Sequence, residues 1–229
     1  QRIHIALTVN GLPMGAEGRA EGPVRILGRV VGTGPIERVD VFRGLELLRT
    51  ISPYTPRSFE GSRRYRIAWA GSRVRGRDRL TTWDGYLELS EGRIEGAEPW
   101  AMENPEKGIT KRSERRIDWA SNTTGDDDGV DVTLSAPVSA VLRLRTPIIS
   151  LDVPLSDLAD GATKAFPADG VDLRAFMRRL PECDLTRQLA IDVMDDAPPS
   201  GICAAYWLRA TQEDGAQAWT SPVYLDVER

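Results

Sequence analysis

The chain is poor in the residues that most often carry chemistry. Its 229 residues include one histidine, His4, and two cysteines, Cys183 and Cys203. Catalytic triads and transition-metal sites rely on histidine, commonly on more than one, and two cysteines are too few for a disulfide scaffold or a structural zinc site. We therefore expect neither catalytic residues nor a cofactor site in this chain. The two thiols either form a disulfide, if the protein resides in the bacterial periplasm rather than the cytoplasm, or remain free and partly buried.

Long apolar runs and an excess of positive charge are also absent. No apolar run approaches the roughly 20 residues of a membrane-spanning helix, so we expect no membrane span. The 30 basic and 34 acidic residues give a net charge of −4, which argues against binding to nucleic acid. The chain begins within an alternating segment, without an initiator methionine or a signal peptide, so we expect it to be a piece of a longer polypeptide.

Period-two alternation of apolar with polar or small residues is what the sequence has in abundance. Such a segment buries one face and leaves the other in solvent. Many short strands separated by glycine and proline predict an all-β fold, here an immunoglobulin-like β-sandwich with an inserted β-rich unit and at most one or two short helices. The clearest alternating segments are residues 2–9, 24–31, 38–42, 64–69, 87–89, 130–135, 142–145 and 188–193.

Residues 172–180 fit two kinds of element. Asp172 could cap a short helix with four apolar residues on one stripe. The alternation of Leu173, Ala175 and Met177 instead fits a strand. We favour the helix at this position.

The C-terminal residues 204–227 show the strongest local pattern. Two alternating apolar segments flank the polar turn sequence Glu-Asp-Gly at residues 213–215. This pattern predicts a β-hairpin in which Gly215 adopts a positive φ. Trp219 is predicted to lie at the start of the return strand, either in the core or as a docking residue on the surface.

Polar stretches at residues 72–79 and 101–114 interrupt the strand pattern. They suggest that residues 1–71 and 185–229 form one discontinuous β-sandwich and that residues 72–184 form an inserted β-rich unit. Greek-key connections make such a discontinuous domain plausible. One enlarged sandwich spanning residues 1–229 is the alternative.

Acidic residues are densest at residues 126–131. Closely spaced carboxylates are the ligands that calcium prefers, so Asp126, Asp128 and Asp131 are weak candidates for a metal site. The spacing departs from an EF-hand loop, which needs a glycine at its sixth position and an acidic residue at its twelfth. A polar turn leading into a strand accounts for the same residues, and we favour that interpretation.

Arginines and tryptophans are the remaining candidates for binding. The arginines of residues 73–79 and of residues 112–116 could bind an anion or an acidic partner, or could form a solvated face and structural ion pairs. Tryptophans exposed on a β-sandwich would suggest stacking on carbohydrate, whereas buried ones stabilise a core. The candidates for binding or interface contacts are Trp83, Trp119, Trp207, Trp219, Arg112 and Arg115.

Several segments resemble a known family over most of the chain, in matching order. The tail segments YWLRATQEDG (206–215) and AWTSPVY (218–224) are similar to the C-terminal end of a family of uncharacterised bacterial proteins. The N-terminal region of those proteins looks like a PHP-type (polymerase and histidinol phosphatase) metallohydrolase. Further matching segments are NGLPMG (10–15), PIERVDV (35–41), WDG (83–85) and residues 119–129.

The resemblance implies that this chain is the C-terminal β-region of such a protein. The family's metal ligands lie in its N-terminal region, and none of those motifs occurs here, so no catalytic residue carries over. The implied role is that of a non-catalytic accessory domain, which packs on or shapes the hydrolase domain or forms an oligomer interface. The parent protein would be a metal-dependent hydrolase. The competing interpretation is a β-sandwich module that binds carbohydrate or another ligand.

Overall fold

The computed structural model describes residues 2–77, 79–102, 104–159 and 161–228. The fold is all-β, with several sheets in a sandwich-like arrangement, as the alternation predicts. The helical elements of the described residues are two short 3₁₀ helices, η1 (Pro56–Phe59) and η2 (Leu155–Leu158). None of the helices in the described part of the chain is long and apolar enough to span a bilayer.

The chain divides into two compact units. Unit 1 contains residues 1–54 and 184–229, and unit 2 contains residues 55–183. The boundary predicted after residue 71 is therefore wrong, because it lies within β7 (Arg64–Ser72), which pairs on both sides with strands of unit 2. Each unit has its own cluster of buried apolar side chains, so one enlarged sandwich does not form.

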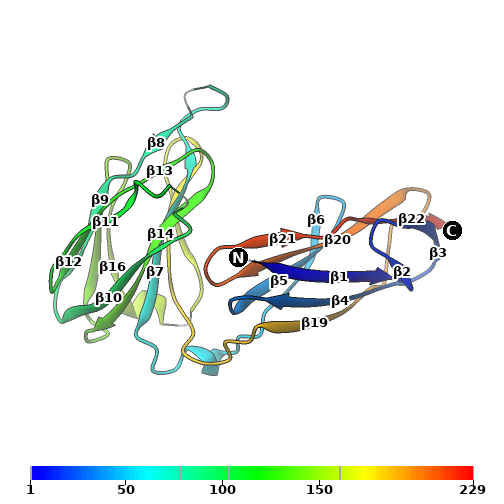
Figure 1. The fold of residues 1–229 in the computed structure, drawn as a ribbon, viewed down its shortest axis with the longest axis horizontal. Coiled ribbons are helices and arrows are strands. Elements are labelled where there is room, and N and C mark those ends of the chain that lie inside the picture. The colour runs from blue at the N-terminus through cyan, green and yellow to red at the C-terminus, as the bar shows by residue number, and fades with distance from the viewer. Residues whose placement is uncertain (1, 78, 103, 160, 229) are drawn as a thin grey trace. The chain divides into compact units, whose positions relative to one another are not determined.

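Unit 1 consists of two sheets with an apolar core between them (Figure 1). Alternation places Ile5, Leu7 and Val9 of the first strand in that core. One sheet has the order β19 (Gln188–Asp195), β4 (Val24–Gly32), β1 (Ile3–Val9), β2 (Leu12–Pro13). The other has the order β3 (Glu17–Glu21), β22 (Val223–Glu228), β20 (Cys203–Gln212), β5 (Ile36–Arg43), β6 (Glu46–Ile51), with β21 (Gln217–Trp219) also paired to β20.

The central strand β20 is held to its surroundings by a buried polar contact. The Tyr206 hydroxyl donates a 2.8 Å hydrogen bond to Asp195 at the end of β19, and Arg43 of β5 donates to the same carboxylate oxygen at 2.8 Å. Burial and this carboxylate raise the pKa of Tyr206 well above its usual range. The contact ties together strands from both sheets of unit 1.

Unit 2 is a second sandwich, with an apolar core shared by two five-stranded sheets. Its first sheet has the order β10 (Arg93–Trp100), β14 (Asp127–Ser135), β7, β18 (Val171–Arg179), β17 (Lys164–Pro167). Its second sheet has the order β11 (Gly108–Arg112), β12 (Arg116–Ala120), β9 (Gly85–Leu89), β15 (Val141–Arg145), β16 (Ser150–Pro154). The short strands β8 (Thr81–Thr82) and β13 (Asn122–Thr123) pair with each other.

The helix favoured at residues 172–180 is wrong, because β18 occupies this segment. Leu173, Ala175 and Met177 alternate into the core, where they pack beneath the partner sheet. Asp172 has a φ of 53°, which an N-cap residue does not adopt. The apolar spacing allowed both elements, and pairing with β7 and β17 selects the strand.

Candidate functional site

The outward side of the β20-containing sheet carries a group of aromatic side chains, here called the aromatic face: Phe42, Trp207, Trp219 and Tyr224. Strand alternation produces it, because Tyr206, Leu208 and Ala210 are buried on the inner side and the residues between them point outward. Trp207 lies opposite Phe42 of β5, Arg209 lies opposite Trp219 of β21, and Ala205 lies opposite Tyr224 of β22. Four strands thus contribute to one face.

Two rings of the aromatic face are fixed and two are exposed. Phe42 and Trp207 stack with their centroids 4.1 Å apart and their planes 5° from parallel, and the Trp207 indole donates a 2.8 Å hydrogen bond to the Gly44 carbonyl. Trp219 is 58% exposed and Tyr224 is 41% exposed. A rigid stacked pair therefore stands beside two rings that solvent reaches.

The charged groups beside the stacked pair are held by one another. Arg209 donates to the Asp40 carboxylate at 2.8 Å, and the Thr50 hydroxyl donates to it at 2.7 Å. The Arg209 guanidinium also lies 5.2 Å from the centroid of the Phe42 ring. Burial alone would raise the pKa of Asp40, but these hydrogen bonds and the nearby Arg38 outweigh it and lower that pKa. Asp40 is therefore a structural carboxylate that fixes the orientation of Arg209.

A groove of about 390 Å³ adjoins the exposed Tyr224 ring. Its other side chains come from neighbouring positions on β3, β22 and β20, namely Glu17, Arg19, Asp226 and Cys203. Desolvation and the carboxylates of Asp226 and Glu17 raise the pKa of the Cys203 thiol. The groove therefore offers two carboxylates, one arginine and a protonated thiol rather than a nucleophilic thiolate.

The tryptophan candidates divide between the core and the surface. Trp207 and Trp219 meet on the aromatic face, whereas Trp83 and Trp119 are 0% and 3% exposed in the core of unit 2. Trp69 stacks on Trp119 with centroids 4.7 Å apart, and the Trp119 indole donates to the Trp83 carbonyl at 2.8 Å. Trp83 and Trp119 are thus wrong as surface candidates, because the facing sheet covers them.

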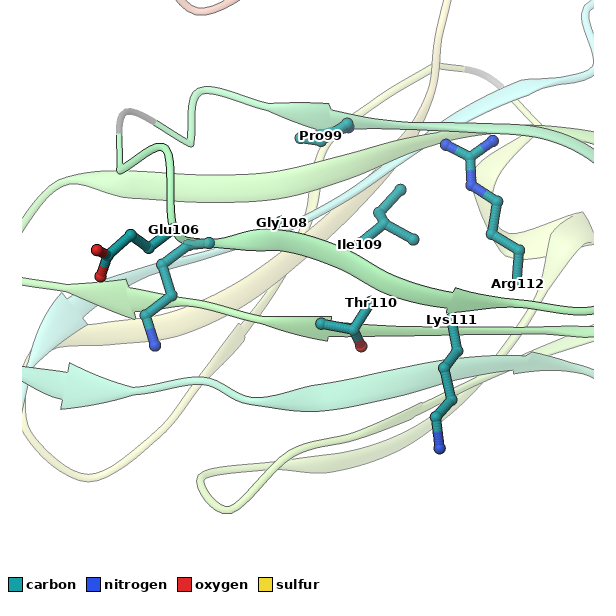
Figure 2. A pocket seen from close by; sticks show the side chains of 8 residues that line it. Pro99, Glu106, Gly108, Ile109, Thr110, Lys111 and Arg112 are labelled. Carbon is teal, nitrogen blue, oxygen red and sulfur yellow. The ribbon is translucent and has the colours of Figure 1, made fainter.

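The guanidinium groups of the arginine candidates Arg112 and Arg115 donate hydrogen bonds to backbone carbonyl groups. Arg112 donates to the Ala97 carbonyl of β10, and Arg115 donates to the Gly92 carbonyl at 3.1 Å. Arg112 also lines a groove of about 480 Å³ between the edge strands β10 and β11. Figure 2 shows its side chain extending toward the strand of Pro99, whereas Lys111 extends away from it. Arg112 thereby bridges the two sheets at the edge of the sandwich.

The acidic candidates Asp126, Asp128 and Asp131 do not converge on one point. Asp126 accepts a hydrogen bond from the Thr124 backbone N–H, Asp128 is buried and accepts one from the Ser121 hydroxyl, and Asp131 accepts two from Arg66. Alternation along β14 directs Asp128 inward and Asp131 outward. Within the described residues, no group of three or more His, Cys, Asp or Glu side chains could hold a metal ion.

Both cysteines are exposed, and no disulfide joins Cys183 to Cys203. Cys203 belongs to the groove beside Tyr224. Phe42, Tyr224 and Arg209 are members of the site that no local sequence pattern marks as such. The alternation of residues 205–209 already predicts the shared face of Trp207 and Arg209, but the pairing of β20 with β5 and β22 is needed to bring Phe42 and Tyr224 to it.

Comparison with known proteins identifies no family for this chain. No protein-family model matches it, and neither does any curated protein. Among solved structures, BcpA, the major pilin subunit of Bacillus cereus, aligns at 9% identity over 99% of this chain and 69% of that chain, with a TM-score of 0.13. A TM-score this low carries no argument about fold or function.

Proposed function

We propose that this chain is a non-catalytic accessory β-module that docks through its aromatic face onto an N-terminal PHP-like metallohydrolase region of the same polypeptide. The observation that carries the proposal is the exposed Trp219 beside the rigid Phe42–Trp207 stack. Exposed aromatic groups next to an oriented arginine are typical of the residues that dominate binding energy at protein interfaces. The resemblance of the tail to the C-terminal end of that hydrolase family supplies the partner.

The aromatic face has the character of an interface rather than of a reactive centre. Arg209 is oriented by Asp40, and the Trp207 ring is fixed by Phe42 and by Gly44, so little side-chain freedom would be lost there on binding. Leu47, directly opposite Phe42 on β6, is 50% exposed and extends the apolar surface. A second copy of the chain is the other protein partner that such a surface could accept.

The test measures association between this chain and the N-terminal region produced separately. Trp219→Ala should weaken association by about 30-fold or more, because a residue of this kind at the centre of an interface contributes about 2 kcal/mol or more. Met194→Ala is the matched control, since Met194 is 48% exposed on the opposite sheet. Both variants should melt within a few degrees of the wild type, because both side chains are largely exposed.

Three results would contradict the proposal. The coding sequence upstream of Gln1 could lack a region rich in histidine and aspartate, the two parts could fail to associate, or the two variants could weaken association equally. Concentration-dependent dimerisation that Trp219→Ala abolishes would assign the face to a second copy of the chain instead.

A carbohydrate is the second candidate partner, and the groove beside Tyr224 favours it. An exposed ring flanked by Glu17 and Asp226 can stack on a sugar while the carboxylates accept hydrogen bonds from its hydroxyl groups. A glycan array and quenching of tryptophan fluorescence by soluble sugars test this candidate. Binding that Tyr224→Ala abolishes would support it, and a flat response across many glycans would exclude it.

A further inference from the structure

The strand β19 forms an open edge of unit 1, because it is the outermost strand of its sheet and lies beside β4 (Figure 1). Its eight residues pair with β4 in one unbroken register and include no proline, lysine or bulge. Proteins commonly protect exposed edges with such features or with very short strands, because an open edge can pair with another chain.

The other edges among the described strands carry such protection. The strands β2, β8 and β13 have two residues each, and β21 has three. A bulge interrupts the pairing of β6, β10 and β11. The strands β16 and β17 end in proline, and β3 is a short strand of sequence EGRAE, in which most residues are charged. The edge of β19 is therefore the one most suited to pairing with another chain.

The backbone of β19 presents unbonded groups along this edge. The Gly32 N–H of β4 donates to the Arg187 carbonyl at 2.9 Å, and the direction of the backbone groups alternates along an antiparallel strand. Odd-numbered residues of β19 therefore bond to β4, and even-numbered residues point to the open edge. No hydrogen bond within the described part of the chain uses the backbone groups of three of them, Ala190, Asp192 and Met194.

The open segment has a defined length. At its start, the Thr186 hydroxyl is bonded to both the N–H and the C=O of Gln188. At its end, the buried Asp195 carboxylate accepts hydrogen bonds from within unit 1. Residues 189–194 are therefore the part of β19 that can accept a further strand.

The inner face of this segment is apolar. Ile191 and Val193 are buried in the core of unit 1, and Leu189 packs against that core while remaining partly exposed. A strand that pairs with β19 must supply apolar side chains on the same face to cover Leu189. An antiparallel second copy of β19 does so, because it brings its own Leu189 and Val193 to that face.

One antiparallel register suits two copies of β19. Residues that point to the open edge must lie opposite one another to exchange hydrogen bonds. Placing Asp192 opposite itself would bring like charges together, which is destabilising, and a shift that places Asp192 opposite Met194 would set Ile191 beside Asp195. Placing Asp192 opposite Ala190 avoids both. Ile191 then lies opposite itself, and Leu189 lies opposite Val193.

The outer face is complementary in charge in the same register. Arg29 of β4 is exposed and lies directly opposite Ala190. In the pair, Asp192 of the second copy lies just beyond Ala190, and the small alanine side chain leaves room for Arg29 to reach it. Arg29 donates to the Gln188 side chain at 3.0 Å in the single chain, a neutral acceptor that a carboxylate can replace.

We propose that two copies of this protein pair through residues 189–194 of β19, as antiparallel strands related by a two-fold axis at Ile191. A peptide of another protein could use the same backbone groups, but the second copy is favoured because β19 complements itself on both faces. The contact is small beside a standard interface of about 1,600 Å², so the dimer dissociates on dilution. It is separate from the aromatic face, which lies on the other sheet of unit 1.

Sedimentation velocity of the full chain at rising protein concentration tests the pairing. The wild type should dimerise, and Ala190→Pro should remain monomeric, because proline lacks the N–H that faces the second copy and is tolerated on an edge strand. Ala165→Pro is the matched control and should dimerise as the wild type does. Ala165 is an exposed residue of the edge strand β17, and its N–H also points to an open edge, because the N–H of Ala168 bonds to β18.

A charge variant tests the outer face without changing the backbone. Arg29→Glu should weaken dimerisation by about tenfold, because two symmetry-related attractive pairs become repulsive. Arg49→Glu makes the same change at an exposed position of β6 and should have no effect. Trp219→Ala should also leave dimerisation unchanged, which separates this contact from docking through the aromatic face. Thermal melting of each variant verifies that it is folded.

Disulfide trapping tests the register. In a Cys183→Ser/Cys203→Ser background, Ile191→Cys should form covalent dimers with oxidised glutathione, because residues opposite each other in a non-hydrogen-bonded pair have Cα atoms about 4.5 Å apart. Val193→Cys is the matched control on the same face and should not form them, since it lies opposite Leu189 of the second copy.

Three results would overturn the proposal. They are a wild type that stays monomeric up to about 1 mM, equal dimerisation of the wild type and Ala190→Pro, and equal trapping of the two cysteine variants. If Ala190→Pro instead weakens association with the N-terminal region while the wild type stays monomeric, the edge binds that region and the assignment to a second copy fails.

Discussion

At the scale of single residues, pairing determines which charged side chains are structural. Arg66 is 1% exposed, donates to both oxygens of Asp131 at 2.7 Å, and lies 4.2 Å from the centroid of the Trp100 ring. Burying such a charged pair carries a large desolvation penalty, so the pair adds little net free energy to folding. Removing one partner is nevertheless strongly destabilising, because the other charge is left without a counter-charge. Asp40 is a second enclosed charged group of this kind, because it accepts hydrogen bonds from Arg209 and Thr50.

Asp40 should make unit 1 sensitive to acid. Its pKa in the folded state is lowered, so its ionised form stabilises the fold above the unfolded pKa of about 3.9. This stabilisation is lost as pH falls through the lower, folded pKa. Asp40→Asn should reduce the free energy of unfolding at neutral pH by about 1–3 kcal/mol, because Arg209 and Thr50 lose the charged acceptor of their hydrogen bonds while solvent still screens the partly exposed Arg209.

The free energy of unfolding of the whole chain is measured by denaturant titration at neutral pH and near pH 3. The difference between wild type and Asp40→Asn should shrink in acid, because protonation removes the same charge from the wild type. A difference that stays constant over this range would show that Asp40 does not interact through its charge.

Cys203 should react slowly with alkylating reagents. Desolvation and the carboxylates of Asp226 and Glu17 raise the pKa of its thiol, so the thiolate fraction at mildly alkaline pH is below that of an ordinary cysteine. In a Cys183→Ser background, Asp226→Asn should lower that pKa and speed the reaction with iodoacetamide. Glu46→Gln, which removes a carboxylate that does not line the groove, is the control. Equal rates for the three proteins would contradict this electrostatic account.

At the scale of elements, the closing hairpin combines local turn chemistry with an exposed strand. Gly215 has a φ of 90° and its backbone N–H donates to the Gln212 carbonyl at 3.0 Å, as the Asp-Gly sequence predicts. Trp219 lies on the return strand β21 and is largely exposed. The core position considered for Trp219 is therefore wrong, because its side chain projects from the outer side of the sheet.

Gly215→Val should lower the free energy of unfolding of unit 1 by about 1–2 kcal/mol, because a β-branched residue is strained at positive φ. Gly215→Asn is the matched control and should cost less, since asparagine tolerates this conformation, as Asn10 does at a φ of 47°. Chemical denaturation measures both. Equal stability of the valine variant and the wild type would mean that the turn relaxes to a different geometry.

At the scale of the whole molecule, two separate cores should respond separately to mutation. Leu87 belongs to the core of unit 2 and Leu208 to the core of unit 1, and each is fully buried. Truncation of either to alanine should cost about 2–5 kcal/mol. Hydrogen–deuterium exchange read by mass spectrometry should quicken in residues 55–183 for Leu87→Ala and in residues 1–54 and 184–229 for Leu208→Ala. Exchange that quickens in both units for either variant would indicate one cooperative domain.

The sequence by itself determined the class of structure, because the evidence for it is local. Alternation placed strands at residues 2–9 and 188–193, and the Asp-Gly turn located the closing hairpin. Both signals depend only on neighbouring residues and on backbone conformation. Segments with little alternation, such as Glu17–Glu21, which pairs in parallel with β22, were not identified as strands.

Only the tertiary structure decided whether each face of a strand is covered by another sheet or exposed to solvent. Alternation assigns Trp119 and Trp207 each to one side of a strand, but only the presence of a second sheet makes one side buried and leaves the other in solvent. The same holds for residues 172–180, where pairing with β7 selected a strand from a spacing that also fits a helix. Burial and strand pairing are long-range properties, so residues far apart in the chain, such as Phe42, Trp207 and Tyr224, meet on one face only after the fold is complete.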